Sequence, residues 1–151
     1  FVVHTPLTDI TVLGTEFNVN TYDSSEVSTA LVNGAVRTNE IGGKSISLQP
    51  GYEAIFSKKT GFGVKAFDSN DILSWQKGVY YFRDASLEDI ASVIRRWYGD
   101  TLIFDGRESS SSRFTGAMLK EKPVTEFLEN LASTSDIHYY MKNSDIHITV
   151  K

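Results

Sequence analysis

The sequence contains no cysteine, no long apolar run and no excess of positive charge. Without cysteine there are no disulfides, no thiolate metal ligands and no cysteine nucleophile. No stretch approaches the roughly 20 apolar residues that span a bilayer, and the N-terminus lacks a signal-peptide pattern. Fifteen basic residues face 19 acidic ones, giving a net charge of -4. This balance argues against nucleic acid as a partner, because a phosphate-binding surface needs a basic excess.

The residues that are present are typical of a folded protein. Hydrophobic residues make up 40% of the 151 positions and charged residues 23%, which excludes wholesale disorder, collagen and coiled coil. The length suits one domain or two very small ones. Because the chain opens on Phe1 without an initiator methionine, we expect it to be a fragment of a longer protein.

The first half, residues 1–67, has a sequence pattern typical of β-strands. Short apolar runs with β-branched residues are separated by turn signals at intervals of about 8–12 residues, which predicts an all-β unit. Asn33-Gly34 predicts a two-residue hairpin, because both positions tolerate positive φ. Pro50-Gly51 predicts a type II turn, with proline fixing φ and glycine taking the left-handed position.

The second half, residues 79–150, has a helical period that occurs twice. The first helix begins at a capping-box-like pair, Ser86 and Asp89, and the second begins at Pro123, which suits a first helical position. Apolar residues follow at helical spacing, and a shift of 37 superimposes the two helices. With the flanking strand-like segments, this predicts two β-α-β units in tandem. A serine-rich loop over residues 106–113 connects them.

A final hairpin is predicted around Asn143-Ser144. Its register buries one face and exposes the other, because a one-residue slip would bury the histidines. The predicted core-facing pairs are Met141 with Ile146, Tyr139 with Ile148, and Ile137 with Val150. The opposite face carries His138, Tyr140, His147 and Thr149. Between the two halves, residues 68–78 predict a short helical turn whose Trp75 packs the units together.

Catalytic and metal-binding patterns are weak. The three histidines, His4, His138 and His147, have no spaced partner for a zinc site, and we interpret them as solvated. No nucleophile elbow, no His–Asp pairing and no phosphate-binding glycine loop is evident. The acidic cluster that includes Asp71 and Asp84 is explained by a helix start. We therefore expect a binding protein with no enzymatic activity, no cofactor, no metal and no small-molecule substrate.

The segment Arg95-Arg96-Trp97-Tyr98 is the candidate partner-binding site. Two arginines beside two aromatic residues resemble a surface that combines charge with stacking. The alternative is that Trp97 and Tyr98 continue the apolar helix face while Arg95 and Arg96 are solvated charges, and this alternative is the stronger one.

Several ordered motifs resemble FecR-type anti-sigma regulators of the Bacteroidetes type. Residues 12–19 (VLGTEFNV) resemble the VLGTxFNV signature, and residues 30–36 and 48–54 resemble the segments that follow it. Residues 75–82, 87–90 and 96–98 are similar to the small C-terminal module of these proteins. The tandem β-α-β units are also similar to the secretin and TonB short N-terminal module, a protein-interaction fold with exposed sheet edges.

The resemblance implies a role in cell-surface signalling. Such a chain would be the periplasmic portion of a single-pass inner-membrane protein. Its partner would be the signalling domain of a SusC-like, TonB-dependent outer-membrane transporter. An extracytoplasmic-function sigma factor would be held only through an N-terminal segment that this chain lacks. Rival hypotheses are a structural module of a secretin-type envelope assembly, and a glycan-degrading enzyme, which would need paired carboxylates in a cleft.

The resemblance further implies two domains and one covalent possibility. Residues 1–68 would form an N-terminally incomplete FecR-like β domain, either solenoid-like or a sandwich. Residues 69–151 would form the α+β repeat module. Some relatives self-cleave at the bond corresponding to Gly14-Thr15, where the threonine hydroxyl attacks the preceding carbonyl. The alternative, which we favour, is that Gly14 is a β-bulge and Thr15 an ordinary strand residue.

Overall fold

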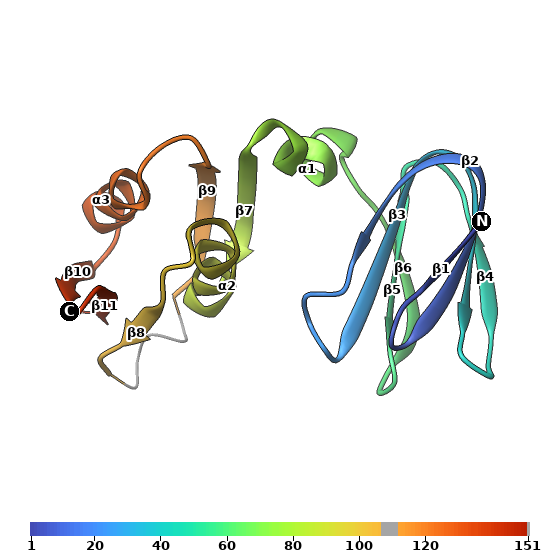
Figure 1. Cartoon of the computed structure of the whole chain (residues 1–151), viewed down its shortest axis with the longest axis horizontal. Helices are drawn as coiled ribbons and strands as arrows, with labels where there is room; N and C mark the ends of the chain where they lie inside the picture. Colours follow the sequence, from blue (N-terminus) through green and yellow to red (C-terminus); the bar gives the residue numbers. More distant parts are fainter. Residues whose placement is uncertain (107–111, 151) are drawn as a thin grey trace. The chain divides into compact units, whose positions relative to one another are not determined.

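The computed structural model describes residues 1–106 and 112–150 (Figure 1). The chain divides into two compact units, Phe1–Leu73 (unit 1) and Ser74–Lys151 (unit 2). Part of the serine-rich loop expected over residues 106–113 lies outside the described residues. The short helical turn predicted between the halves is confirmed, as α1 (Ser69–Leu73) followed by the 3-10 helix η1 (Ser74–Lys77).

Unit 1 is built on one antiparallel sheet. Its order is β1-β2-β3-β5-β6, and β4 pairs with β3 beside this path. The strands are β1 (Val2–His4), β2 (Thr8–Asn20), β3 (Glu26–Glu40), β4 (Ser45–Leu48), β5 (Tyr52–Ser57) and β6 (Gly61–Ala66). The predicted β-rich unit is thus confirmed, and its arrangement is an open antiparallel sheet.

The two long strands β2 and β3 hold unit 1 together. The first part of β3 pairs with β5, while its last part pairs with β4. Ile10 of β2 lies opposite the last part of β3, yet it belongs to the same buried cluster as Leu31 and Ala54, which lie in the other half of the sheet. The sheet therefore folds over so that its two halves enclose this cluster, and a second, smaller cluster forms around Leu7, Val27 and Phe56.

The hairpin predicted at Asn33-Gly34 is wrong. β3 runs through these residues without turning, and its register against β2 shifts between Leu13 and Glu16. Gly34 has φ +93°, and a Cβ there would lie 2.5 Å from Thr15 Cγ2 and 2.8 Å from the Gly14 carbonyl oxygen. This glycine is therefore required by a bulge and by the close approach of the neighbouring strand.

The turn predicted at Pro50-Gly51 is confirmed. Gly51 has φ +86°, and the N–H of Tyr52 donates to the carbonyl of Gln49 at 3.2 Å. These features define a type II turn between β4 and β5. The reversal between β3 and β4 falls instead on residues 41–44, where Gly42 takes the left-handed conformation.

Unit 2 has the predicted order of elements. They are β7 (Val79–Ala85), α2 (Leu87–Tyr98), β8 (Leu102–Phe104), β9 (Phe114–Leu119), α3 (Val124–Thr134), β10 (Ile137–Lys142) and β11 (Asp145–Val150). The capping box that begins α2 is confirmed: the Ser86 hydroxyl accepts from the Asp89 N–H, and the Asp89 carboxylate accepts from the Ser86 N–H. Gly99, at φ +81°, ends the helix.

The strands of unit 2 pair between the two predicted β-α-β units and not within them. β7 pairs antiparallel with β9, and β8 pairs parallel with β11, which also forms a hairpin with β10. The expectation of two separate β-α-β units is therefore corrected to two small sheets that share one core with α2 and α3. β8 has only three residues, and its pairing with β11 places it in a three-stranded sheet, which is more stable than an isolated pair of short strands.

The register predicted for the last hairpin is confirmed at every pair. Asn143 and Ser144 form the turn, both with positive φ. Ile137, Ile146 and Ile148 are fully buried, as expected of a core wall. Met141 departs from the prediction, because its side chain is 53% exposed. It stands at the turn end of the hairpin, where the wall extends past the rest of the core.

Candidate interaction site

Strand β9 has an open edge. Within the described residues it pairs only with β7, and four of its six residues are exposed. The N–H of Lys120 donates to the carbonyl of Gly78 at 2.8 Å, so this pair is a hydrogen-bonded one. Because hydrogen-bonded and non-hydrogen-bonded pairs alternate along an antiparallel ladder, Ala117, opposite Tyr81, directs its N–H and C=O away from β7. The backbone of Ala117 is thus available to another strand.

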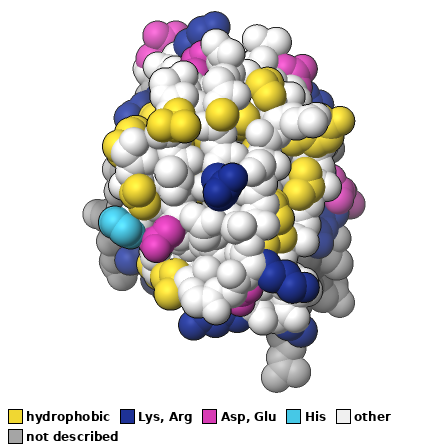
Figure 2. Space-filling view, turned by 90° about the vertical axis from the view of Figure 1, so that its right-hand side faces the viewer, with side chains coloured by type: hydrophobic (Ala, Val, Ile, Leu, Met, Phe, Trp, Pro, Cys, Tyr) yellow, Lys and Arg dark blue, Asp and Glu magenta, His cyan; other side chains and the backbone are white. Residues whose placement is uncertain are grey.

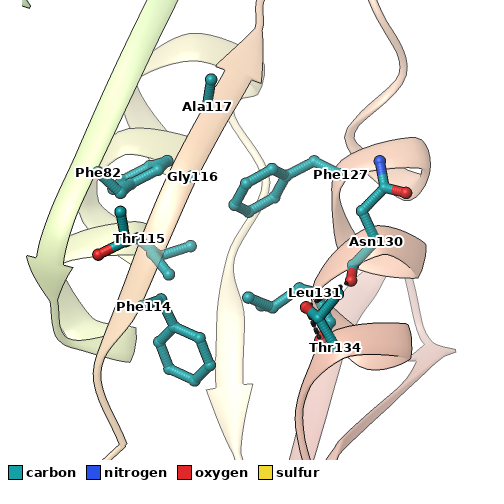
Figure 3. A pocket seen from close by; sticks show the side chains of 10 residues that line it. Phe82, Phe114, Thr115, Gly116, Ala117, Phe127, Asn130, Leu131 and Thr134 are labelled. Carbon is teal, nitrogen blue, oxygen red and sulfur yellow. Dashed lines mark hydrogen bonds between the residues drawn. The ribbon is translucent and has the colours of Figure 1, made fainter.

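A pocket of 220 Å³ lies beside this edge, between β9 and α3 (Figure 3). Figure 3 shows the ring of Phe127 and the side chain of Leu131 extending from α3 toward β9. Polar groups at the pocket are Thr115, Asn130 and Thr134, and its apolar lining comes from Phe82, Ile90, Phe114, Phe127 and Leu131. Among the described residues, no charged side chain lines it.

Gly116 is the reason that the pocket is open. Side chains alternate along a strand, so Gly116 lies on the same face as Phe114 and the buried Met118 but contributes no side chain. Its backbone is not left-handed, and a Cβ there would meet no atom within 4 Å. Neither conformation nor packing therefore requires glycine at this position.

The predicted partner-binding segment lies at the end of α2. Trp97 packs on the core with its ring perpendicular to that of Tyr80, at 5.8 Å between centroids. The Tyr98 hydroxyl donates to the carbonyl of Leu119 at 2.8 Å. Trp97 therefore packs α2 against β7, and Tyr98 ties α2 to the end of β9. Arg95 is exposed, and a direct role of Arg95, Arg96, Trp97 and Tyr98 in binding stays a prediction.

Sequence reasoning missed a polar cluster around Asp105. The prediction that the chain has no His–Asp pair was wrong, because His147 Nδ1 lies 3.0 Å from the Asp105 carboxylate. The Tyr140 hydroxyl donates to the same carboxylate at 2.6 Å, and the Tyr140 and His147 rings stack at 4.9 Å. The cluster depends on the parallel pairing of β8 with β11, in which the Asp105 N–H donates to the Ile148 carbonyl. Only that pairing could have revealed it.

The Asp105 cluster predicts an acid-sensitive contribution to stability. The hydrogen bond from Tyr140, with lesser help from His147, lowers the pKa of Asp105 below its ordinary value of 3.8. A carboxyl whose pKa is lower in the folded state stabilises the fold above its unfolded pKa, and this contribution disappears as pH falls through the folded pKa.

We expect the conformational stability of unit 2 to fall as the pH drops below about 3.8, the ordinary pKa of the Asp105 carboxyl, and to keep falling until the pH is below the lowered pKa of the folded state. In Asp105→Asn this fall should be smaller. Trp75 and Trp97, the two tryptophans of the chain, both lie in unit 2 and report its unfolding by fluorescence. Equal pH dependence in both proteins would contradict this role of Asp105. Asp145→Asn, on the neighbouring hairpin, is the matched control.

Gly14 and Thr15 form the bulge that we favoured. Gly14 has φ +58°, and the two residues interrupt the register of β2. The Thr15 hydroxyl is buried and has no hydrogen-bond partner within the described chain. Self-cleavage between Gly14 and Thr15 stays a prediction.

Other surfaces are less specific. On the face of unit 1 drawn in Figure 2, hydrophobic side chains occur in separate groups among polar ones. His4 is exposed and paired with Asp9 at 2.7 Å. No group of three or more His, Cys, Asp or Glu side chains that could hold a metal ion occurs among the described residues. No helix of the described chain is long and apolar enough to cross a bilayer.

An open strand edge beside an uncharged pocket is typical of proteins that bind a segment of another protein. Such sites bind extended polypeptide, because main-chain hydrogen bonds provide affinity and pockets for alternate side chains provide specificity. The fold and the site thus indicate a protein-interaction module.

Comparison with known proteins gives a family match for part of unit 2. Residues 79–148 match the family model described as "FecR, C-terminal", so this part of unit 2 is a FecR C-terminal domain. The resemblance drawn from the sequence motifs is confirmed for this part of the chain. No curated protein matches the chain.

Solved structures share the fold of the whole chain. Two crystal structures of a candidate anti-sigma factor from Parabacteroides distasonis ATCC 8503, at 1.65 and 2.50 Å resolution, each superpose with a TM-score of 0.86. Each match is 22% identical and covers 100% of this chain and 71% of the other. At this identity the likeness shows a common fold.

Proposed function

We propose that this chain is the periplasmic sensor part of a single-pass inner-membrane anti-sigma factor. It binds the signalling domain of a SusC-like, TonB-dependent outer-membrane transporter. The signal then passes to an extracytoplasmic-function sigma factor, which is held by a segment outside this chain. The single observation that carries the proposal is the FecR C-terminal domain at residues 79–148.

The geometry of unit 2 supports binding as the mechanism. β9 offers backbone groups that no described strand satisfies, and the adjoining pocket is apolar and uncharged. Docking at such a site requires no bond-making chemistry, no cofactor and no small-molecule substrate. The rival, a structural module of a secretin-type assembly, accounts for unit 2 but gives no role to the VLGTEFNV segment of unit 1.

A reporter strain tests the proposal. The full-length protein is expressed with its transporter, its sigma factor and a sigma-dependent reporter gene, and the transporter's nutrient is added. We expect deletion of residues 74–151 to abolish the response to the nutrient. A response that persists at the wild-type level without these residues would contradict the proposed relay, provided that immunoblotting shows the shortened protein at normal abundance.

A further inference from the structure

We propose that β9 accepts a short extended segment of the partner protein, with acidic residues at its ends and one large apolar residue at its centre. That residue occupies the pocket between β9 and α3. The identity of the partner rests on the proposed function, whereas the binding geometry rests only on unit 2.

The backbone of β9 provides the first support. Ala117 directs one donor and one acceptor away from β7, and its small side chain leaves them accessible. An edge of this kind is a template for another strand, and proteins normally blunt such edges with charges, proline or bulges. The six residues of β9 include no charge and no proline. The outer edge is therefore open at Ala117, whereas at the end of the strand the Leu119 carbonyl already accepts from the Tyr98 hydroxyl.

Gly116 provides the second support. Glycine in the interior of a strand weakens the strand and often marks a place where another backbone or a ligand approaches closely. The fold imposes no need for glycine here, because an added Cβ would meet nothing within 4 Å. A vacant side-chain position therefore faces the pocket from β9, opposite Phe127 of α3 (Figure 3).

The pocket has the size of one large side chain. An apolar cavity of roughly 150 Å³ accommodates a benzene ring, and this pocket measures 220 Å³. Because alternate side chains of a docked strand point to the same face, one residue of the partner enters the pocket while its neighbours point away. Phenylalanine or leucine fits both the volume and the apolar walls.

The positive charges at the two ends of β9 indicate which residues the partner segment has at its own ends. Arg113 precedes the strand and Lys120 follows it, and both are exposed. Neither forms an ion pair with a carboxylate among the described residues, whereas Glu126 nearby is already paired with Lys122 at 3.5 Å. An extended segment of about seven residues spans Arg113 to Lys120 at roughly 3.3 Å per residue. Acidic residues at its ends would complement both charges.

The direct test is titration of the ¹⁵N-labelled full chain with a blocked peptide of about seven residues. It has aspartate at both ends, phenylalanine at the centre, and valine and threonine between them. We expect saturable shifts of the amide signals over β9 and the facing residues of α3. A second peptide with lysine at both ends should bind at least tenfold more weakly, and added salt should reduce the difference.

Two variants with matched controls separate the edge from the pocket. Ala117→Pro removes the outward N–H without removing a bond to β7, and Val64→Pro does the same at the exposed edge strand β6 of unit 1. Gly116→Leu fills the pocket, and Gly63→Leu adds the same side chain to the exposed strand β6 of unit 1, where a Cβ would meet only the Ile55 carbonyl oxygen at 3.9 Å. We expect Ala117→Pro and Gly116→Leu to weaken peptide binding at least tenfold, and the two controls to leave it unchanged. Thermal melts establish that each variant is folded.

The same four variants are then measured against the transporter's signalling domain. Loss of binding in Ala117→Pro and Gly116→Leu alone supports the inference. If the wild-type chain binds the domain and both variants bind it equally well, the β9 site is overturned while the proposed function stands. If the peptide binds at β9 but the domain does not bind at all, the site stands and the proposed function fails. Absence of shifts over β9 with the acidic peptide also overturns the site.

Discussion

Replacing Gly34 with alanine is expected to destabilise unit 1 by roughly 2–5 kcal/mol in the free energy of unfolding. Two effects combine. Alanine at φ +93° is strained, and its Cβ would lie 2.5 Å from Thr15 Cγ2 and 2.8 Å from the Gly14 carbonyl oxygen. The backbone of β2 cannot retreat without breaking its ladder with β3, the longest in the sheet. Urea unfolding followed by far-UV circular dichroism measures the loss.

Gly42→Ala is the matched control for this prediction. Gly42 is also left-handed, at φ +76°, but a Cβ there would meet nothing within 4 Å. Only the conformational strain remains, so we expect a loss of about 1–2 kcal/mol. Equal losses at both positions would show that the close approach at the bulge has no energetic weight, contrary to our account of β2 and β3.

Replacing Ile148 with alanine is expected to destabilise unit 2 by about 2–5 kcal/mol. Its side chain has no exposed surface, and it belongs to the cluster that joins both helices to both small sheets. Removing the side chain leaves a cavity that the surrounding elements cannot fill, because β11 is held on both sides by β8 and β10. Urea unfolding followed by tryptophan fluorescence reports on this unit.

Met141→Ala, in the same hairpin, tests whether burial of the side chain, and not its position on the predicted core face, determines the loss of stability. Met141 and Ile148 were predicted to line one core wall, but Met141 is 53% exposed. We expect a loss below about 0.5 kcal/mol, as for a surface substitution. A large loss would indicate that the end of the hairpin is covered.

Local patterns predicted most of the elements. The capping box at Ser86, the turn at Pro50-Gly51 and the register around Asn143-Ser144 depend on neighbouring residues alone, and each is confirmed. The hairpin at Asn33-Gly34 failed because glycine serves a bulge as readily as a turn, and only the approach of Gly14 from another strand distinguishes the two.

The pairing of strands that are distant in the sequence could not be predicted from local patterns. The order of elements along the chain, β7-α2-β8, suggested that β7 and β8 pair with each other within one β-α-β unit. Instead, β7 pairs with β9 and β8 pairs with β11. The candidate site depends on that exchange. The open edge at Ala117, the vacancy at Gly116 and the Asp105 cluster each arise between segments that are distant in the sequence. The family motifs predicted the class of protein without locating its interaction surface.

Isothermal titration calorimetry of this chain with the purified signalling domain of its transporter tests the central claim most directly. We predict saturable binding with one domain per chain and no need for added metal, cofactor or small molecule. A signalling domain from an unrelated transporter should release no heat of binding. Absence of binding to the cognate domain at the highest soluble concentration, with both proteins folded, would contradict the claim that this chain works by engaging that domain.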